Sequence, residues 1–254
     1  MQLGNRRTLV AVAALVVIAV LAARAEATSK AQLTVYAAAS LTDVFPKIDS
    51  SQRYSFGGSN TLAAQITQGA PADVFASANM TLPQQLFANG TCSKPVVFTR
   101  NTLVVVVPTS NPAGIKSVYD LTKSGVKLVV AGAAVPVGGY TLQILRNMNL
   151  STGVLKNVVS RETDVREVLS KVALGEADAG FVYSTDAKTV PGRVTVIKVP
   201  AWAQPKVQYG ACIVQRSPNK ADAQAFINKL IAKAGQSKLI TAGFLPRVKP
   251  VQKK

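Results

Sequence analysis

Short runs of apolar, often β-branched, residues recur along this chain, and segments with helical spacing separate them. Continuous apolar runs of about 4–8 residues are typical of strands that are buried on both faces of a sheet. The clearest run is Leu103–Val107. We predict strands over residues 33–39, 54–56, 73–77, 103–107, 127–131, 180–183, 193–199 and 208–215. Because predicted helices lie between these strands, the alternation indicates an α/β chain with mostly parallel sheets.

Three predicted helices follow strands directly. Ser40–Asp43 has the pattern of a capping box and predicts a helix start, although Pro46 would shorten or kink that helix. Ser59 follows Gly57-Gly58 and is expected to cap a second helix. Val135–Gly139 is expected to form a turn that leads into a helix over about 140–148. Further helices are predicted over residues 80–89, 165–172 and 221–234.

These strand-to-helix junctions indicate where a ligand would bind. Ligands of α/β proteins bind beyond the carboxyl ends of strands, where helix N-termini expose free N–H groups and favour anions. Each junction alone is more often an ordinary helix cap or a tight turn. Several junctions together in one basic chain favour an anion site.

The composition excludes several classes of protein. Of 254 residues, 48% are hydrophobic and 16% charged, which argues against a disordered chain and suggests one large or two modest domains. The net charge is +17, and the absence of histidine excludes His-dependent triads and His metal sites. The cationic residues are scattered and aromatic residues are only 6%, so we expect no nucleic-acid partner. Without a nucleophile elbow or a phosphate-binding loop of the GxxxxGK[ST] type, we expect no enzyme and no cofactor.

The N-terminal segment has the composition of a secretory signal peptide. Arg6 and Arg7 precede the apolar stretch Thr8–Ala23, and Ala25-Glu26-Ala27 fits a cleavage site. We therefore predict a signal peptide over residues 1–27 and an exported protein, periplasmic or otherwise extracytoplasmic, with a mature net charge of +15. The alternative is an uncleaved N-terminal anchor that tethers the protein to the membrane.

Cys92 and Cys212 are the only cysteines. In an exported chain they allow a single disulfide, and the alternative is two buried thiols. They lack CxxC spacing, so neither a zinc site nor redox chemistry of the thioredoxin kind is predicted.

Several segments resemble the periplasmic molybdate-binding proteins of the ModA type. The matching segments are 37–43, 55–62, 65–66, 68–78, 103–108, 135–138, 163–166, 180–187 and 243–244. Gly-Ala-Pro-Ala-Asp-Val-Phe at 69–75 is the most specific of them. The resemblance covers essentially the whole mature chain.

The resemblance implies the type II periplasmic binding protein fold, in which two α/β lobes with mixed, mostly parallel sheets enclose a ligand cleft. It implies a first lobe from residues 28–99 and 204–254, and a second lobe from residues 100–203. The implied function is the solute-binding component of an ABC importer, which captures molybdate or tungstate and delivers it to a membrane permease. We expect a monomer.

The family holds its oxyanion with neutral hydrogen-bond donors rather than with Lys or Arg. By resemblance, the hydroxyl donors are Ser40, Ser59 and Tyr183, and the backbone N–H donors are Val137 and Val165. The structural alternatives are that the serines are simple caps, that Val165 belongs to the core and that Tyr183 is an ordinary strand residue. No residue is predicted to ligate a metal cation directly, because the molybdenum would be bound as its oxyanion.

The chain also departs from the family pattern. Pro46 and a short linker replace a longer helix after the first serine, and Val137 is often smaller in the family. The cysteines are not part of the pattern, and we expect a Cys92–Cys212 disulfide to staple the hinge between the lobes. Rival functions are the same fold binding sulfate or another tetrahedral oxyanion, an exported anion-processing enzyme, and a basic adhesion or nucleic-acid module.

Overall fold

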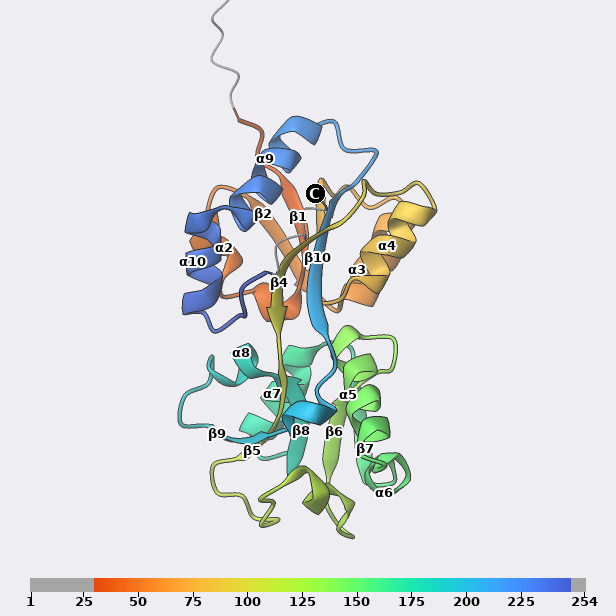
Figure 1. Cartoon of the computed structure of the whole chain (residues 1–254), viewed down its shortest axis with the longest axis vertical. Helices are drawn as coiled ribbons and strands as arrows, with labels where there is room; N and C mark the ends of the chain where they lie inside the picture. The colour runs from red at the N-terminus through yellow and green to blue at the C-terminus, as the bar shows by residue number, and fades with distance from the viewer. Residues whose placement is uncertain (1–29, 248–254) are drawn as a thin grey trace, which may run out of the picture. The chain divides into compact units, whose positions relative to one another are not determined.

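The computed structural model describes residues 30–247, which form two α/β lobes, each built on a five-stranded sheet (Figure 1). The predicted α/β architecture with two lobes is confirmed. The sheets are mixed rather than mostly parallel, because the described strands form four parallel and four antiparallel pairs. The predicted signal peptide, residues 1–27, lies outside the described residues.

The first lobe is built on a sheet with the strand order β2-β1-β3-β10-β4. Its strands are β1 (Thr34–Ala38), β2 (Arg53–Gly57), β3 (Val74–Ser77), β4 (Val96–Asn101) and β10 (Val207–Ile213). β1 is parallel to β2 and β3, whereas β10 runs antiparallel to β3 and β4. Its α-helices are α2 (Phe45–Ile48), α3 (Ser59–Thr67), α4 (Thr81–Ala88), α9 (Lys220–Ile231) and α10 (Lys233–Thr241). In Figure 1, α3 and α4 cover one face of this sheet, and α2, α9 and α10 lie on the other side.

The second lobe is built on a sheet with the strand order β7-β6-β8-β5-β9. Its strands are β5 (Leu103–Pro108), β6 (Leu128–Ala131), β7 (Val158–Glu162), β8 (Ala179–Tyr183) and β9 (Val194–Lys198). β6 is parallel to β7 and β8, and β5 is antiparallel to β8 and β9. The α-helices are α5 (Pro136–Asn147), α6 (Ser151–Leu155), α7 (Val165–Ala173) and α8 (Ser184–Ala187), and two 3₁₀ helices are η2 (Val118–Thr122) and η3 (Ala201–Ala203).

The long apolar runs of the sequence are the central strands of these sheets. Every residue of β3, β5, β6 and β8 is buried, because helices or loops cover both faces. The chain passes from the first sheet to the second between β4 and β5, and it returns between β9 and β10. The predicted lobe boundary at 99/100 lies inside β4 and the one at 203/204 lies in the returning connection, and both stay predictions.

The predicted helix starting at Ser40 is wrong. The chain forms the 3₁₀ turn η1 (Ala39–Leu41) and then the one-turn helix α2, which has Pro46 in its first turn. A continuous helix from Ser40 would place Pro46 in its interior, where proline has no N–H to donate and its ring meets the preceding turn. The helix therefore begins anew at Phe45, with proline at a tolerated position.

Two further helices differ from their predicted bounds. Val135–Gly139 is not a turn before a helix, because α5 begins at Pro136 and residues 136–139 form its first turn. Gly138 is required there, since a Cβ atom would lie 2.1 Å from the carbonyl oxygen of Gly132. The predicted helix over 221–234 is divided into α9 and α10 by Ala232, whose backbone is extended at φ −70° and ψ 160°.

The cysteines pack in a small apolar cluster of the first lobe. Cys92 and Cys212 are fully buried free thiols, beneath Leu62 and Ile66 of α3 and Leu86 of α4. A hydrogen bond with Cys92, together with burial, raises the pKa of the Cys212 thiol. The predicted disulfide is not formed in the structure.

The predicted position of this pair at the hinge is wrong. Cys212 lies in β10 opposite Phe75 of β3, and Cys92 lies opposite Val214. Both residues therefore belong to one lobe, away from the two crossings between the sheets.

Candidate functional site

A pocket lies where the strand ends of the two lobes face each other. The first lobe contributes residues 38–40, 57–59 and 78, and the second contributes residues 135–137, 164, 165 and 183. The space among these residues, which includes part that is open to solvent, is about 200 Å³. All five residues predicted from the sequence line this pocket and are at least nine-tenths buried: Ser40, Ser59, Val137, Val165 and Tyr183.

Ser40 ends a chain of hydrogen bonds that runs through Tyr209 and Asn101. The Asn101 amide is oriented by its Oδ1, which accepts the N–H of Thr102 at 2.9 Å, so its Nδ2 faces the Tyr209 hydroxyl at 3.4 Å. The Tyr209 hydroxyl lies 2.9 Å from Ser40 Oγ. Either hydroxyl can donate in this bond. When Tyr209 donates, the Ser40 proton is available to a ligand in the pocket.

Ser59 is not the N-cap residue that the sequence predicted. Gly58 is the N-cap residue of α3 and Ser59 is the first helical residue. Ser59 Oγ accepts the N–H of Ala78 at 3.1 Å. Since that bond uses the oxygen as an acceptor, the Ser59 proton remains available to a ligand.

Helices α3, α5 and α7 begin at the pocket, and the first N–H groups of each have no acceptor within the helix. Val137 is the second residue of α5, and Val165 is the first residue of α7. Asp164 also lines the pocket, but its Oδ1 accepts the N–H groups of Arg166 at 2.7 Å and Glu167 at 3.1 Å. This carboxylate is thereby turned towards the helix as its N-cap.

Tyr183 presents a buried hydroxyl without a hydrogen-bond partner among residues 30–247. Its exposed fraction is 1%, and its ring lies 5.6 Å from that of Tyr209. Burial, with smaller contributions from neighbouring Tyr209 and Tyr140, raises the pKa of Tyr183 well above its usual value. The hydroxyl therefore stays protonated and acts as a donor that lacks an acceptor.

The residues that sequence reasoning missed lie behind the pocket. Tyr209 and Asn101 orient Ser40, and no motif signals this role because both residues lie in strands. Asn60, the second residue of α3, also has a buried amide oxygen without a partner among the described residues.

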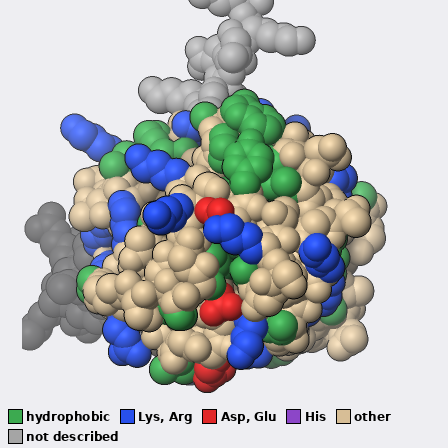
Figure 2. Space-filling view, turned by 90° about the horizontal axis from the view of Figure 1, so that it is seen from below, with side chains coloured by type: hydrophobic (Ala, Val, Ile, Leu, Met, Phe, Trp, Pro, Cys, Tyr) green, Lys and Arg blue, Asp and Glu red, His purple; other side chains and the backbone are tan. Residues whose placement is uncertain are grey.

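The charge of the pocket is unusual for an anion site. None of the lining residues is Lys or Arg. Across the face drawn in Figure 2, the cationic side chains are dispersed rather than gathered into one stripe. Within the described part of the chain, no group of His, Cys, Asp or Glu could hold a metal ion, and no helix is long and apolar enough to span a membrane.

Two α/β lobes with a buried pocket of neutral donors between them define the class of two-lobed solute-binding proteins. The chain belongs to the bacterial extracellular solute-binding protein family, whose profile matches residues 33–245. The resemblance to molybdate-binding proteins is confirmed.

Relatives and solved structures agree with this assignment. The molybdate-binding protein ModA of Mycobacterium tuberculosis is 37% identical over 222 residues, which cover 84% of each chain. The periplasmic molybdate-binding protein of Azotobacter vinelandii has a TM-score of 0.73 at 24% identity, covering 85% of this chain and 100% of that one. The sulfate-binding protein SubI of Mycobacterium tuberculosis has a TM-score of 0.76 at 20% identity, covering 86% and 88%. At these identities the two structures show the fold.

Proposed function

We propose that this protein is the extracytoplasmic molybdate-binding component of an ABC importer. It captures molybdate or tungstate between its two lobes and delivers the anion to a membrane permease. The observation that carries the proposal is the buried, unpartnered hydroxyl of Tyr183 in a pocket lined by further neutral donors. An unpaired buried donor is costly, so a ligand that accepts its hydrogen bond is strongly favoured there.

The proposed ligand contacts are three hydroxyls and two backbone N–H groups. Ser40 and Ser59 donate from the first lobe, and Val137, Val165 and Tyr183 donate from the second. Such donors suit a desolvated dianion better than Lys or Arg, because no second buried charge has to lose its hydration. The lobes at 28–99 with 204–254, and at 100–203, close around the anion as a two-state equilibrium that the ligand shifts.

A site made only of donors also selects by protonation. Molybdate, tungstate and sulfate are fully deprotonated dianions at neutral pH, whereas hydrogen phosphate brings a P–O–H group that meets a donor instead of an acceptor. Such a mismatch disfavours phosphate. Sulfate binding on the same fold is the second candidate function, which the fold of the sulfate-binding protein supports.

The remaining features follow from this role. The protein binds and releases its ligand as a monomer, without catalysis and without a cofactor. Export by the segment 1–27 places it outside the cytoplasm, in the periplasm or tethered to the membrane where that segment is retained.

The test is isothermal titration of residues 28–254 with molybdate, tungstate, sulfate and phosphate. We expect molybdate and tungstate to bind with similar affinity, because their size and charge are nearly equal, and the smaller sulfate to bind more weakly. Sulfate binding as tightly as molybdate would transfer the assignment to the second candidate. Binding of none of the four anions would refute the oxyanion proposal.

A further inference from the structure

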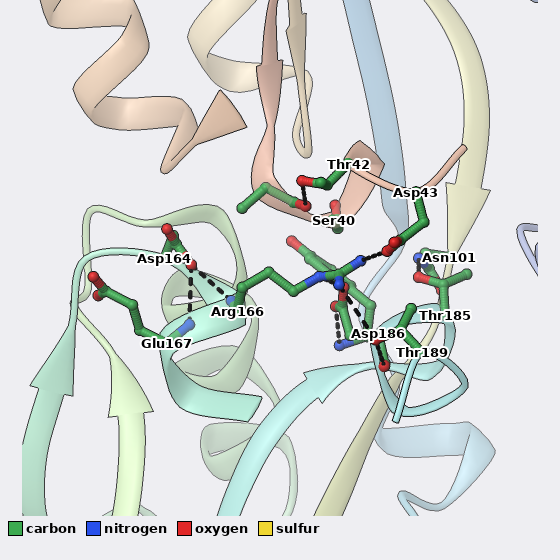
Figure 3. Close-up of polar contacts among 12 residues, drawn as sticks. Ser40, Thr42, Asp43, Asn101, Asp164, Arg166, Glu167, Thr185, Asp186 and Thr189 are labelled. Carbon is green, nitrogen blue, oxygen red and sulfur yellow. Dashed lines mark hydrogen bonds and ion pairs between the residues drawn. The ribbon is translucent and has the colours of Figure 1, made fainter. Parts of the chain in front are cut away.

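Three charged residues converge beside the pocket without lining it. Arg166, the second residue of α7, pairs with Asp43 of the first lobe and with Asp186 of α8 (Figure 3). Its Nη2 lies 2.6 Å from Asp43 Oδ2, its Nε lies 2.9 Å from Asp186 Oδ1, and its Nη1 donates to Thr189 Oγ1 at 3.2 Å. The three guanidinium nitrogens thus have three different partners, of which only Asp43 belongs to the first lobe.

The two ion pairs have different environments. The Asp186 side chain is fully buried, the Arg166 side chain is 26% exposed, and the Asp43 side chain is 50% exposed. Asp186 Oδ2 also accepts the N–H of Tyr183 at 3.2 Å. The pair with Asp186 therefore fixes the guanidinium within the second lobe, while the pair with Asp43 lies at the solvent edge and can separate.

Each charged residue is close in sequence to a proposed ligand contact. Asp43 follows Ser40 by three positions and lies just after the turn η1, where Thr42 Oγ1 donates to the carbonyl of Ala39 at 2.7 Å. Arg166 directly follows Val165, and Asp186 follows Tyr183 by three positions. The Asp43–Arg166 pair therefore lies within three positions of proposed donors in both lobes.

The lobes also touch beside this pair. A Cβ atom on Gly58 of the first lobe would lie 2.3 Å from the carbonyl oxygen of Thr163 of the second. Glycine permits this approach of two backbones. The Asp43–Arg166 contact thus accompanies a close approach of the lobes.

We propose that Asp43 and Arg166 form a latch that stabilises the closed form and slows ligand release. The proposal rests on the proposed function, because the latch acts on closure around the anion and not on the anion itself. Arg166 is a positioning residue, since it does not line the pocket. Asp186 makes the latch reversible: it keeps the guanidinium compensated when Asp43 moves away, so opening leaves no unpaired buried charge.

Arginine suits this geometry. Its planar fork reaches two carboxylates through different nitrogens, whereas the three donors of lysine share one nitrogen and cannot span the same separation. Arg166→Lys is therefore expected to keep the charge and lose one of the two pairs. Asp43→Asn is the cleaner variant, because Asp43 is half exposed and its removal leaves the buried Asp186 pair in place.

The experiment measures molybdate dissociation by stopped flow for the mature wild-type protein, Asp43→Asn, Asp43→Glu and a control. The control is Glu162→Gln, which breaks the 2.7 Å pair of Lys171 and Glu162. That pair joins α7 to β7 within the second lobe and does not reach the first. We expect Asp43→Asn to release molybdate about 3- to 10-fold faster, in line with a partly exposed ion pair.

Further readouts separate a latch from a merely structural role. Asp43→Glu should restore part of the slow release, and Glu162→Gln should release at the wild-type rate. The difference between wild type and Asp43→Asn should shrink with added salt, because the pair is partly exposed. The melting temperature of ligand-free Asp43→Asn should stay close to that of the wild type.

If the wild-type protein binds molybdate and Asp43→Asn releases it at the wild-type rate, the latch is refuted and the proposed function stays intact. Failure of the wild-type protein to bind any of the four oxyanions would overturn the proposed function instead. In that case small-angle scattering of the ligand-free proteins tests the latch. A larger radius of gyration for Asp43→Asn supports it, and equal radii refute it.

Discussion

Tyr183→Phe removes one hydroxyl and leaves a ring of nearly the same shape in a fully packed position. This hydroxyl is buried without a hydrogen-bond partner among the described residues. Its removal should therefore leave the folded state equally stable or stabilise it by up to about 1 kcal/mol. Most substitutions of buried residues destabilise, so unchanged or increased stability is a specific expectation.

Tyr183→Phe should weaken the affinity for molybdate. A hydrogen bond to a charged acceptor contributes about 1.5–3 kcal/mol, which corresponds to a loss of about 10- to 150-fold in molybdate affinity. Because burial raises the pKa of Tyr183, wild-type affinity should show no loss from ionisation of this tyrosine up to about pH 9. Isothermal titration across pH 6–9 and thermal unfolding without ligand measure the two quantities.

Tyr54→Phe is the matched control. The Tyr54 hydroxyl donates to the backbone carbonyls of Phe45 and Asp49, away from the pocket. Its removal should lower the melting temperature and leave molybdate affinity unchanged, whereas Tyr183→Phe should keep the melting temperature and lower the affinity. Unchanged affinity of Tyr183→Phe, or a loss of stability like that of Tyr54→Phe, would refute the role of Tyr183 as a ligand donor.

Three other substitutions test separate features. Tyr209→Phe removes the hydroxyl that is hydrogen-bonded to Ser40 and should weaken molybdate binding about 3- to 10-fold by titration, since Ser40 loses the partner that orients it; equal affinity would contradict this role of Tyr209. Gly58→Ala introduces a Cβ that meets Thr163, so it should lower affinity at least 10-fold while the ligand-free melting temperature changes little. A large fall in that temperature would mean that the contact stabilises the fold rather than limiting closure. Burial raises the pKa of Asp49, but hydrogen bonds from a lysine and two polar neighbours outweigh it and lower the pKa. The folded-state stability from Asp49 is then fully present above about pH 4 and declines as the pH falls towards the lowered folded-state pKa, so Asp49→Asn should cost about 1–2 kcal/mol in urea unfolding at pH 7 and less at pH 3; an equal cost at both would refute this.

The sequence predicted best those features that a short continuous segment determines, such as a buried strand or a binding motif. The buried run Leu103–Val107 predicted a central strand, and the motifs around Ser40 and Tyr183 indicated the family and the residues that meet at the pocket. Strands β4 and β7 were missed because they lie at sheet edges, where polar residues such as Arg100 and Arg161 break the apolar pattern.

Contacts between distant segments could not be predicted. Asp43 and Arg166 are 123 positions apart, and Tyr209 reaches Ser40 across 169 positions. Neither contact has a periodic or local signal, because each arises only after two sheets have formed. The helix predicted at Ser40 failed for a local reason, since the effect of Pro46 on the helix start outweighed the capping-box pattern.

The buried thiols of Cys92 and Cys212 give the protein a natural probe of its local unfolding. Both sulfurs lie under α3 and α4 of the first lobe, so a thiol reagent reaches them only when that lobe opens its own core. Pulse labelling at increasing denaturant therefore measures the stability of the first lobe alone. If the second lobe unfolds first, far-ultraviolet circular dichroism falls while the thiols stay protected. If the lobes unfold together, both signals change at the same denaturant concentration.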